Sequence, residues 1–256
     1  MKILCIGDVC GHIGCDYLAA HLPEIKRKNN IDLTIVNGEN SADGNGMTPF
    51  SIGELFDCGA DIVTGGNHTF RRREVYDFLE ENSCVIRPAN FPDSAPGHGI
   101  AYVDFGYTTV AVISLMGTVY MEALDCPFKT ADRLIEEAKE QGAKIIIVDF
   151  HCEATGEKRA MGFYLDGRIS ALFGTHTHVQ TADAQVLPLG TGYITDLGMT
   201  GPINSVLGIK PQLAIAKMKD KIPVRFENET GKCMINGCVF DIDNNGKTIG
   251  ATAIKL

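Results

Sequence analysis

Five short runs of apolar, largely β-branched residues recur along the chain as far as residue 173, and helix-like segments lie between them. The runs are Ile3–Ile6, Leu33–Val36, Asp61–Thr64, Lys144–Val148 and Ile169–Phe173. Runs that are short and apolar throughout are typical of strands buried in a parallel sheet. Strands that alternate with helices predict an α/β fold, because each parallel connection has to cross over the sheet.

Four segments have the apolar spacing of one helix face. They are Cys15–Lys28, Phe50–Cys58, Arg71–Glu80 and Ala131–Glu140. For the last of them, Thr130 is the predicted N-cap and Gly142 the predicted C-cap.

Two predicted hairpins add antiparallel strands to this pattern. Each joins two strand-like runs through a glycine-containing turn: Ile100–Phe105 and Thr109–Leu115, then Lys232–Asp241 and Lys247–Lys255. The second turn contains Asn245-Gly246, a pair favoured where tight turns need positive φ. We therefore expect a second sheet. No linker, repeat or low-complexity segment is visible, which predicts one domain over residues 1–256.

Composition excludes several classes of protein. The chain is 45% hydrophobic and 21% charged, which is typical of a folded protein. A net charge of −9 argues against a broad nucleic-acid surface, although a short nucleotide held through metals is still allowed. No run approaches the roughly 18 apolar residues of a membrane span, and Asp8 ends the N-terminal run too early for a signal peptide. Nine cysteines without a CxxC pair predict a reducing cytoplasm rather than disulfides or a zinc ribbon.

Each of the five apolar runs is followed by side chains that can bind a metal. The segments are Gly7-Asp8, Asn37-Gly38-Glu39-Asn40, Gly65-Gly66-Asn67-His68, Asp149-Phe150-His151 and Gly174-Thr175-His176-Thr177-His178. In open α/β sheets, ligands bind at the carboxyl ends of the strands. Four of the seven histidines fall in these segments. We therefore predict that the five segments form one site.

Their chemistry predicts a dinuclear metal centre. Imidazole and carboxylate ligands without thiolate suit first-row ions such as Fe, Mn, Co, Ni or Zn. Glu39 has two oxygens and could bridge both ions, while His176 and His178 could each address one of them. Asn40 and Asn67 would add neutral oxygens, which limits negative charge where a phosphate has to bind.

The series GDVCG, NGEN, GGNH, DFH and GTHTH resembles the motifs of the calcineurin-like metallophosphoesterases. The longer stretches RPANFP, DGR, THTHVQTAD and ITDLGMTGP extend the resemblance over essentially the whole chain. They are similar to the bacterial branch of 2′,3′-cyclic-nucleotide 2′-phosphodiesterases. This resemblance implies a four-layer αββα sandwich, in which helices flank two packed, mixed β-sheets and the metals lie at one edge.

The resemblance also implies a role for each predicted site residue. One ion would be held by Asp8, Glu39, Asn40 and His178, and the other by Glu39, Asn67, His151 and His176. His68 would be the acid that protonates the leaving 2′ oxygen, after a metal-activated hydroxide attacks the cyclic phosphate. The product would be a 3′-phosphate. The implied cofactors are two divalent or mixed-valence transition-metal ions, Fe or Mn first and Zn, Co, Ni or Mg as alternatives.

One position departs from the wider superfamily. Its first motif is usually Asp-x-His, whereas Cys10 stands two residues after Asp8, and Asn40 takes the place of the missing histidine. Cys10 is expected to pack rather than to ligate. Arg71–Arg73 could steer phosphate or form a solvated helix face. The spacing Gly7, Gly11, Gly14 is not the GxGxxG of a dinucleotide-binding loop.

Two other functions stay open at this point. A broader-specificity phosphatase or an RNA-directed phosphoesterase of the same superfamily would use the same ligands. A regulatory protein could sense a nucleotide without turnover, although a sensor does not need His68. The expected partner is a small nucleotide phosphodiester, with no membrane and no extensive nucleic-acid surface. The native metal and assembly into a homo-oligomer are not decided by the sequence.

Overall fold

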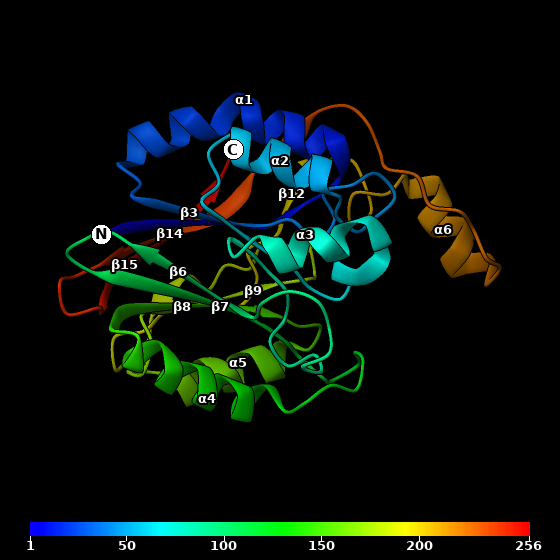
Figure 1. The fold of residues 1–256 in the computed structure, drawn as a ribbon. Helices are drawn as coiled ribbons and strands as arrows, with labels where there is room; N and C mark the ends of the chain where they lie inside the picture. The colour runs from blue at the N-terminus through cyan, green and yellow to red at the C-terminus, as the bar shows by residue number, and fades with distance from the viewer.

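The computed structural model describes residues 1–256 and arranges them in four layers, with two β-sheets between two layers of helices (Figure 1). The first sheet has the order β15-β14-β1-β3-β4-β5. Its strands are β1 (Lys2–Ile6), β3 (Leu33–Asn37), β4 (Ile62–Thr64), β5 (Val85–Ile86), β14 (Asn236–Ile242) and β15 (Thr248–Lys255). β1, β3, β4 and β5 run parallel, while β14 and β15 are antiparallel to their neighbours.

The second sheet has the order β10-β11-β9-β8-β7-β6 and is also mixed. Its strands are β6 (Ile100–Asp104), β7 (Thr109–Met116), β8 (Ala143–His151), β9 (Ala171–Thr175), β10 (Gln185–Val186) and β11 (Gly192–Ile194). A small third sheet joins β13 (Cys233–Met234), β12 (Met199–Pro202) and β2 (Asp8–Val9). The predicted sandwich of two mixed sheets between helices is confirmed.

The helices form the outer layers. The first sheet is covered by α1 (Gly11–Asn29), α2 (Pro49–Asp57) and α3 (Tyr76–Glu81), and the second by α4 (Pro127–Glu140) and α5 (Thr155–Leu165) (Figure 1). The last helix, α6 (Pro211–Asp220), projects from the body, and Ala214 is its only buried residue (Figure 1). No helix is both long and apolar enough to cross a membrane.

All five predicted runs are strands, but they are divided between the sheets: β1, β3 and β4 in the first, β8 and β9 in the second. Both predicted hairpins are present, as β6–β7 and β14–β15, and Gly246 has the positive φ that its turn requires. All nine cysteines are free thiols.

The prediction of one helix over Arg71–Glu80 is wrong. Short 3-10 turns, η1 (Thr69–Arg71) and η2 (Arg73–Val75), precede α3. Between them the backbone of Arg72 is extended, and its side chain donates hydrogen bonds to the carbonyl oxygens of Asp43 and Asn45.

The predicted cap of α4 is also wrong. The helix begins at Pro127, with Cys126 as the N-cap residue, so Thr130 lies inside the first turn. Proline is well suited to the first helical position, because the N–H of that residue has no partner within the helix and its absence costs no hydrogen bond. At the other end, Gly142 follows the cap residue Gln141 and has a φ of 80°.

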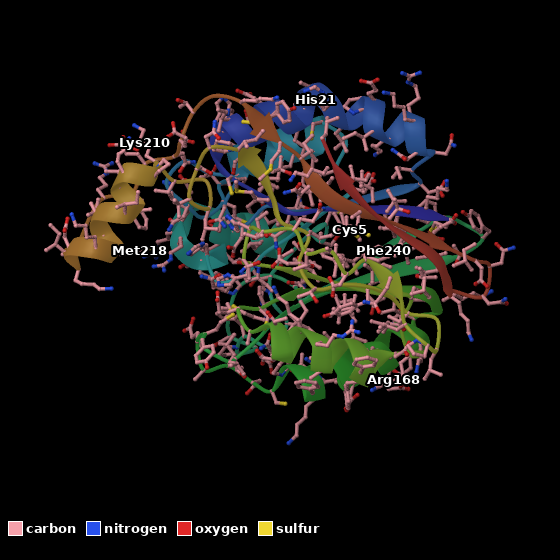
Figure 2. The ribbon with its side chains drawn as sticks, turned by 180° about the vertical axis from the view of Figure 1, so that it is seen from behind. Cys5, His21, Arg168, Lys210, Met218 and Phe240 are labelled. Carbon is pink, nitrogen blue, oxygen red and sulfur yellow. The ribbon has the colours of Figure 1, made fainter.

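Apolar side chains from both sheets meet in the centre of the molecule. Phe240 of β14 and Cys5 of β1 belong to this interior layer, whereas His21 and Arg168 lie on the outer helical layers (Figure 2). Two further apolar groups join the first sheet to α1–α3 and the second to α4 and α5. The two sheets are thereby fixed to each other, which also fixes the relative positions of their strand ends.

This packing predicts the cost of removing the Phe240 ring. Phe240 is 0% exposed, so Phe240→Ala should lower the free energy of unfolding by about 3–5 kcal/mol. Ile249→Ala, on the neighbouring strand at 66% exposure, is the control and should change it by no more than about 0.5 kcal/mol. Denaturant unfolding of wild type, Phe240→Ala and Ile249→Ala measures the differences in the free energy of unfolding. Equal midpoints would contradict the assignment of Phe240 to the core.

Candidate functional site

The predicted site residues meet where the carboxyl-terminal ends of the two sheets come together. Asp8 directly follows β1 across Gly7, and His151 is the last residue of β8. The others lie in the loops after β3, β4 and β9: Glu39, Asn40, Asn67, His68, His176 and His178. Side chains from both sheets therefore reach one point, although they are up to 170 residues apart in sequence.

Glu39, His151 and His176 form the centre of the group. Each offers a ligand atom within 4.8 Å of the other two. His151 Nε2 lies 3.4 Å from Glu39 Oε2 and 3.0 Å from His176 Nδ1. Asn67 Oδ1 is 2.8 Å from the same nitrogen. Of the four side chains predicted for the second ion, His151 thus lies next to each of the other three.

The other predicted group adjoins the first through Glu39. His178 Nε2 lies 3.7 Å from Asp8 Oδ1 and 3.4 Å from Asn40 Nδ2. Asn40 Nδ2 also donates to Glu39 Oε1 at 2.8 Å. The amide nitrogen of Asn40, not its oxygen, therefore faces the other donors, and ligation through Oδ1 requires the amide to turn by half a rotation.

One oxygen of Asp8 is left without a partner. Asp8 is fully buried, and its Oδ2 accepts a hydrogen bond from the His176 backbone N–H, but Oδ1 accepts none. Burial, and then the nearby Glu39, raise the Asp8 pKa well above its usual value. A buried carboxylate oxygen without a donor is costly, and a cation would remove that cost.

Gly66 leaves room for the donor groups. A Cβ at this position would overlap Glu39 Oε2 and His151 Nε2. Glycine therefore lets the backbone after β4 pass directly beside the cluster. Together, the unpaired Asp8 oxygen, the clustered nitrogen and oxygen donors and this close approach fit bound cations.

Hydrogen bonds fix the orientation of two of the imidazoles. His151 Nδ1 is 2.9 Å from Thr175 Oγ1, and that hydroxyl donates to the buried Asp149 carboxylate at 2.7 Å. His178 Nδ1 is 3.2 Å from the Leu207 carbonyl oxygen. In both rings Nε2 is thereby turned toward the carboxylates, the arrangement found in histidines that bind metals.

The pKa shifts of His151 and Glu39 favour the forms that bind metals, whereas that of Asp8 favours the protonated carboxyl until a cation is bound. Burial lowers the pKa of His151 to about 3, so its ring is neutral at pH 7. Burial alone would raise the pKa of Glu39, but His151 and His68 together hold it below its usual range. Behind the site, burial raises the pKa of Asp149 to about 7, against hydrogen bonds from Thr64, Thr175 and Asn37 that favour its carboxylate. Neutral imidazole and charged carboxylate are the forms that ligate.

A buried ion pair that the sequence did not reveal supports the loop after β9. Lys158 Nζ lies 2.7 Å from Asp196 Oδ2, and both side chains are about 1% exposed. The same oxygen accepts the backbone N–H of Thr177 at 3.1 Å. The residues on either side, His176 and His178, have φ of 101° and 62°, which L-residues rarely adopt. Asp196 therefore holds this loop in a conformation that it would not otherwise keep.

Cys10 lies on the outer side of His178. Its sulfur is 3.5 Å from His178 Nδ1, the nitrogen turned away from Asp8. Burial, and then Asp8, raise the pKa of this thiol well above its usual value. A buried, protonated thiol beside the rear of the ring supports packing rather than ligation.

His68 stands at the edge of the group. Its Nδ1 is 2.8 Å from Asn40 Oδ1 and 3.3 Å from Glu39 Oε1, and its backbone N–H donates to Glu39 Oε2. Its side chain is 24% exposed. His68 is therefore placed beside the donors while part of its ring faces open space.

That open space is a cavity of about 480 Å³, which we call the site cavity. Its lining includes Glu39, Asn40, His68, Arg71, His176 and His178, and on the opposite side Lys217 and Phe226. The three consecutive arginines have different surroundings: Arg71 lines the cavity, Arg72 binds backbone carbonyls, and Arg73 is exposed. Of the three, only Arg71 therefore lies where it could meet a ligand in the site cavity.

The architecture is that of the metallophosphoesterases. A 5′-nucleotidase precursor from Thermus thermophilus has this fold, with a TM-score of 0.62 at 12% identity over 100% of this chain and 54% of that chain. More specifically, the chain belongs to the family described as YmdB-like protein, whose model matches residues 4–254.

Three relatives with higher identity cover nearly the whole chain. A 2′,3′-cyclic-nucleotide 2′-phosphodiesterase from Bacillus subtilis (strain 168) is 48% identical over 96% of this chain and 93% of its own length. A hypothetical protein from Thermus thermophilus superimposes with a TM-score of 0.94 at 39% identity, over 100% of this chain and 99% of that one. A novel phosphatase from Mycoplasma pneumoniae also has a TM-score of 0.94, at 33% identity over 100% and 93%.

The buried ion pair can be tested by removing its cation. Lys158→Met leaves Asp196 charged and unpaired, so the free energy of unfolding should fall by about 3–5 kcal/mol. The loop of His176 and His178 should loosen, and the metal content of the purified protein should fall. Lys210→Met, which removes an exposed pair with Glu227, is the control and should cost less than about 1 kcal/mol. Wild-type stability and metal content in Lys158→Met would contradict a supporting role.

Proposed function

We propose that this protein is a metal-dependent phosphodiesterase that hydrolyses 2′,3′-cyclic nucleotides to 3′-phosphates. The observation that carries the proposal is the cluster of Glu39, His151 and His176 next to the pair of Asp8 and His178, with an Asp8 oxygen left unpaired. Family membership and the activity named for the 48% identical Bacillus subtilis relative support the choice of reaction.

The proposal assigns the donors to two ions. Asp8, Glu39, Asn40 and His178 would hold one, and Glu39, Asn67, His151 and His176 the other. When bound, such ions act as Lewis acids that polarise a phosphoryl oxygen and make water more acidic. Donors limited to nitrogen and oxygen favour Fe or Mn, with Zn, Co, Ni or Mg as alternatives.

His68 would supply the proton for the leaving 2′ oxygen. Its Nδ1 faces the acceptor oxygens of Asn40 and Glu39, so Nε2, which has no partner within the chain, would give its proton from a doubly protonated ring, or from a neutral ring in which Nδ1 accepts a hydrogen bond. Positioned acids of this kind typically contribute about 10²–10⁴-fold to the rate. Arg71 and Lys217 at the cavity wall would balance the charge of an arriving phosphate.

The proposal also includes the size of the substrate and the cellular compartment. The substrate would be a small nucleotide phosphodiester, since the site cavity of about 480 Å³ lies within the usual range for small-molecule pockets. A reducing cytoplasm would suit nine free thiols. A broader phosphatase would share the ligands, so the substrate has to be decided by direct comparison.

Metal removal tests the mechanism. The purified protein should carry up to two transition-metal ions per chain, a chelator should abolish hydrolysis, and Mn²⁺ should restore it. Rates should be measured on a 2′,3′-cyclic nucleotide, an aryl phosphodiester and a phosphomonoester, with metal content determined in parallel. Full activity in the metal-free protein would contradict the mechanism. Preference for the monoester would indicate a phosphatase instead.

His68→Ala distinguishes an acid from a ligand. The variant should keep its metals, because none is assigned to His68, while hydrolysis of the cyclic nucleotide slows by about 10²–10⁴-fold. The loss should be smaller for a nitrophenyl diester, whose leaving group departs without a proton. His98→Ala, at an exposed histidine outside the cavity, is the matched control. An equal loss on both substrates, or a lost ion, would show that His68 is not the acid.

A further inference from the structure

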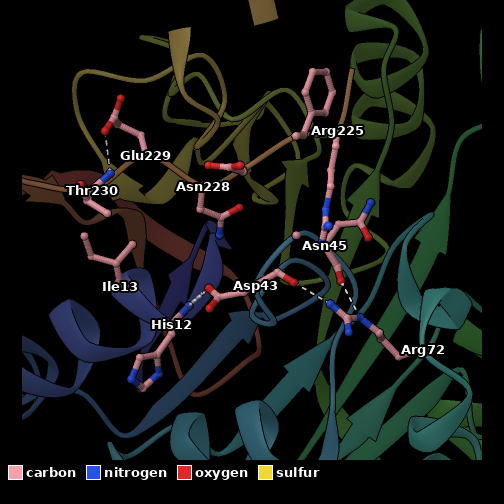
Figure 3. Close-up of a pocket in the computed structure, with 12 residues that line it drawn as sticks. His12, Ile13, Asp43, Asn45, Arg72, Arg225, Asn228, Glu229 and Thr230 are labelled. Atoms are coloured by element: carbon pink, nitrogen blue, oxygen red, sulfur yellow. Dashed lines mark hydrogen bonds between the residues drawn. The ribbon is translucent and has the colours of Figure 1, made fainter. Parts of the chain in front are cut away.

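A second, larger hollow adjoins the site cavity. It measures about 930 Å³ and contains none of the predicted metal ligands (Figure 3). Four residues line both spaces, so the two adjoin each other: Gly44, Asn45, Phe226 and Asn228. A ligand larger than a mononucleotide could therefore extend from the site cavity into this hollow.

Two guanidinium groups line the hollow near Asn45, a residue that also lines the site cavity. Arg72 donates to the carbonyl oxygens of Asp43 and Asn45, and the side chain of Arg225 points toward Asn45 and Arg72 (Figure 3). Neither arginine forms an ion pair with a carboxylate, and Arg225 is exposed. Two cations that line one hollow without an ion-pair partner favour a bound anion, and guanidinium geometry matches phosphate.

The three carboxylates of the hollow do not neutralise these arginines by direct contact. Asp43 turns its carboxylate to the His12 backbone N–H, 3.0 Å away (Figure 3). Glu227 is paired with Lys210 at 2.7 Å. Glu229 accepts the backbone N–H of Thr230, on the side of the hollow opposite Arg72 (Figure 3). The arginines therefore lie beside Asn45 and Phe226, two of the residues that also line the site cavity.

Phe226 stands at the junction of the two spaces. It lines both, and Lys217 Nζ lies 4.5 Å from the centroid of its ring. Aromatic rings flanked by cations are the usual platforms on which bases of single strands stack, without preference for sequence. The junction thus has the chemistry to receive a nucleobase between two phosphates.

We propose that the hollow is a subsite for the phosphodiester that precedes the cyclic end, so that the preferred substrate is a short oligoribonucleotide ending in a 2′,3′-cyclic phosphate. The cyclic phosphate would lie at the metal ligands, and the strand would continue from its 5′ oxygen past Phe226 toward Arg225 and Arg72. The net charge of −9 restricts this to a short strand. The inference rests on the proposed function and adds the substrate class.

The test compares two substrates on the metal-loaded protein: a mononucleoside 2′,3′-cyclic phosphate and a dinucleotide with the same cyclic end. Wild type should prefer the dinucleotide by about tenfold in kcat/KM, the factor that one good ionic contact provides. Arg225→Ala should lose this preference with unchanged mononucleotide kinetics, since Arg225 does not line the site cavity. Arg73→Ala, an exposed arginine that lines neither space, should behave as wild type.

Salt provides a second measurement. Raising the salt from about 50 to 200 mM should reduce the dinucleotide preference of wild type but not of Arg225→Ala, because phosphate contacts weaken as salt rises. A wild type without preference, or an Arg225→Ala variant that loses equally on both substrates, would overturn the subsite and leave the proposed function intact. Hydrolysis of neither substrate would overturn both.

Discussion

Asp8 and Glu39 carry carboxylates into a part of the protein from which water is excluded, and this costs free energy unless donors or cations compensate it. The chain supplies some compensation. Glu39 accepts hydrogen bonds from Asn40 and from the His68 backbone, but one oxygen of Asp8 has no partner. Burial lowers the pKa of His151, His176 and His178, which favours the neutral imidazoles that donate electron pairs. Bound cations would complete this arrangement, and the strands, glycines and supporting hydrogen bonds serve to keep it assembled.

Support for the ligands comes from layers that do not touch the site cavity. The packing of the two sheets through residues such as Phe240 fixes the distance between their strand ends. Behind the ligands, Thr175 connects His151 to Asp149, and Lys158 connects through Asp196 to the loop of the other histidines. Ligand geometry therefore depends on buried polar contacts, which lose much of their value if one partner is removed.

The sequence predicted the parts of the site that follow strand ends, because short apolar runs identify buried strands and parallel strands align their carboxyl ends. It could not predict Lys158 and Asp196, since residues 38 apart share no periodic pattern and their pairing depends on the fold. The helix over Arg71–Glu80 was wrong for a similar reason: Arg72 bonds to a distant loop and interrupts the helical spacing. The hairpins predicted a second sheet and the family resemblance two packed mixed sheets, but neither indicated that the five apolar runs are divided between them. The single domain and the role of each ligand remain predictions.

Asn40 connects the ligand group with the proposed acid. Its amide nitrogen now faces Glu39 and His178, and its oxygen faces Nδ1 of His68. If Asn40 ligates an ion through its oxygen, the amide must turn, and the nitrogen then faces His68. An amide N–H can only donate, so Nδ1 of His68 would have to accept, and a neutral ring would carry its proton on Nε2. Nε2 is the nitrogen without a partner in the chain, where the leaving oxygen of a substrate could receive that proton. Under the proposed function, ligation by Asn40 would therefore also select the tautomer of His68 that can act as an acid. This gives a reason why an asparagine, which has both an oxygen and an N–H, occupies the position next to the expected ion.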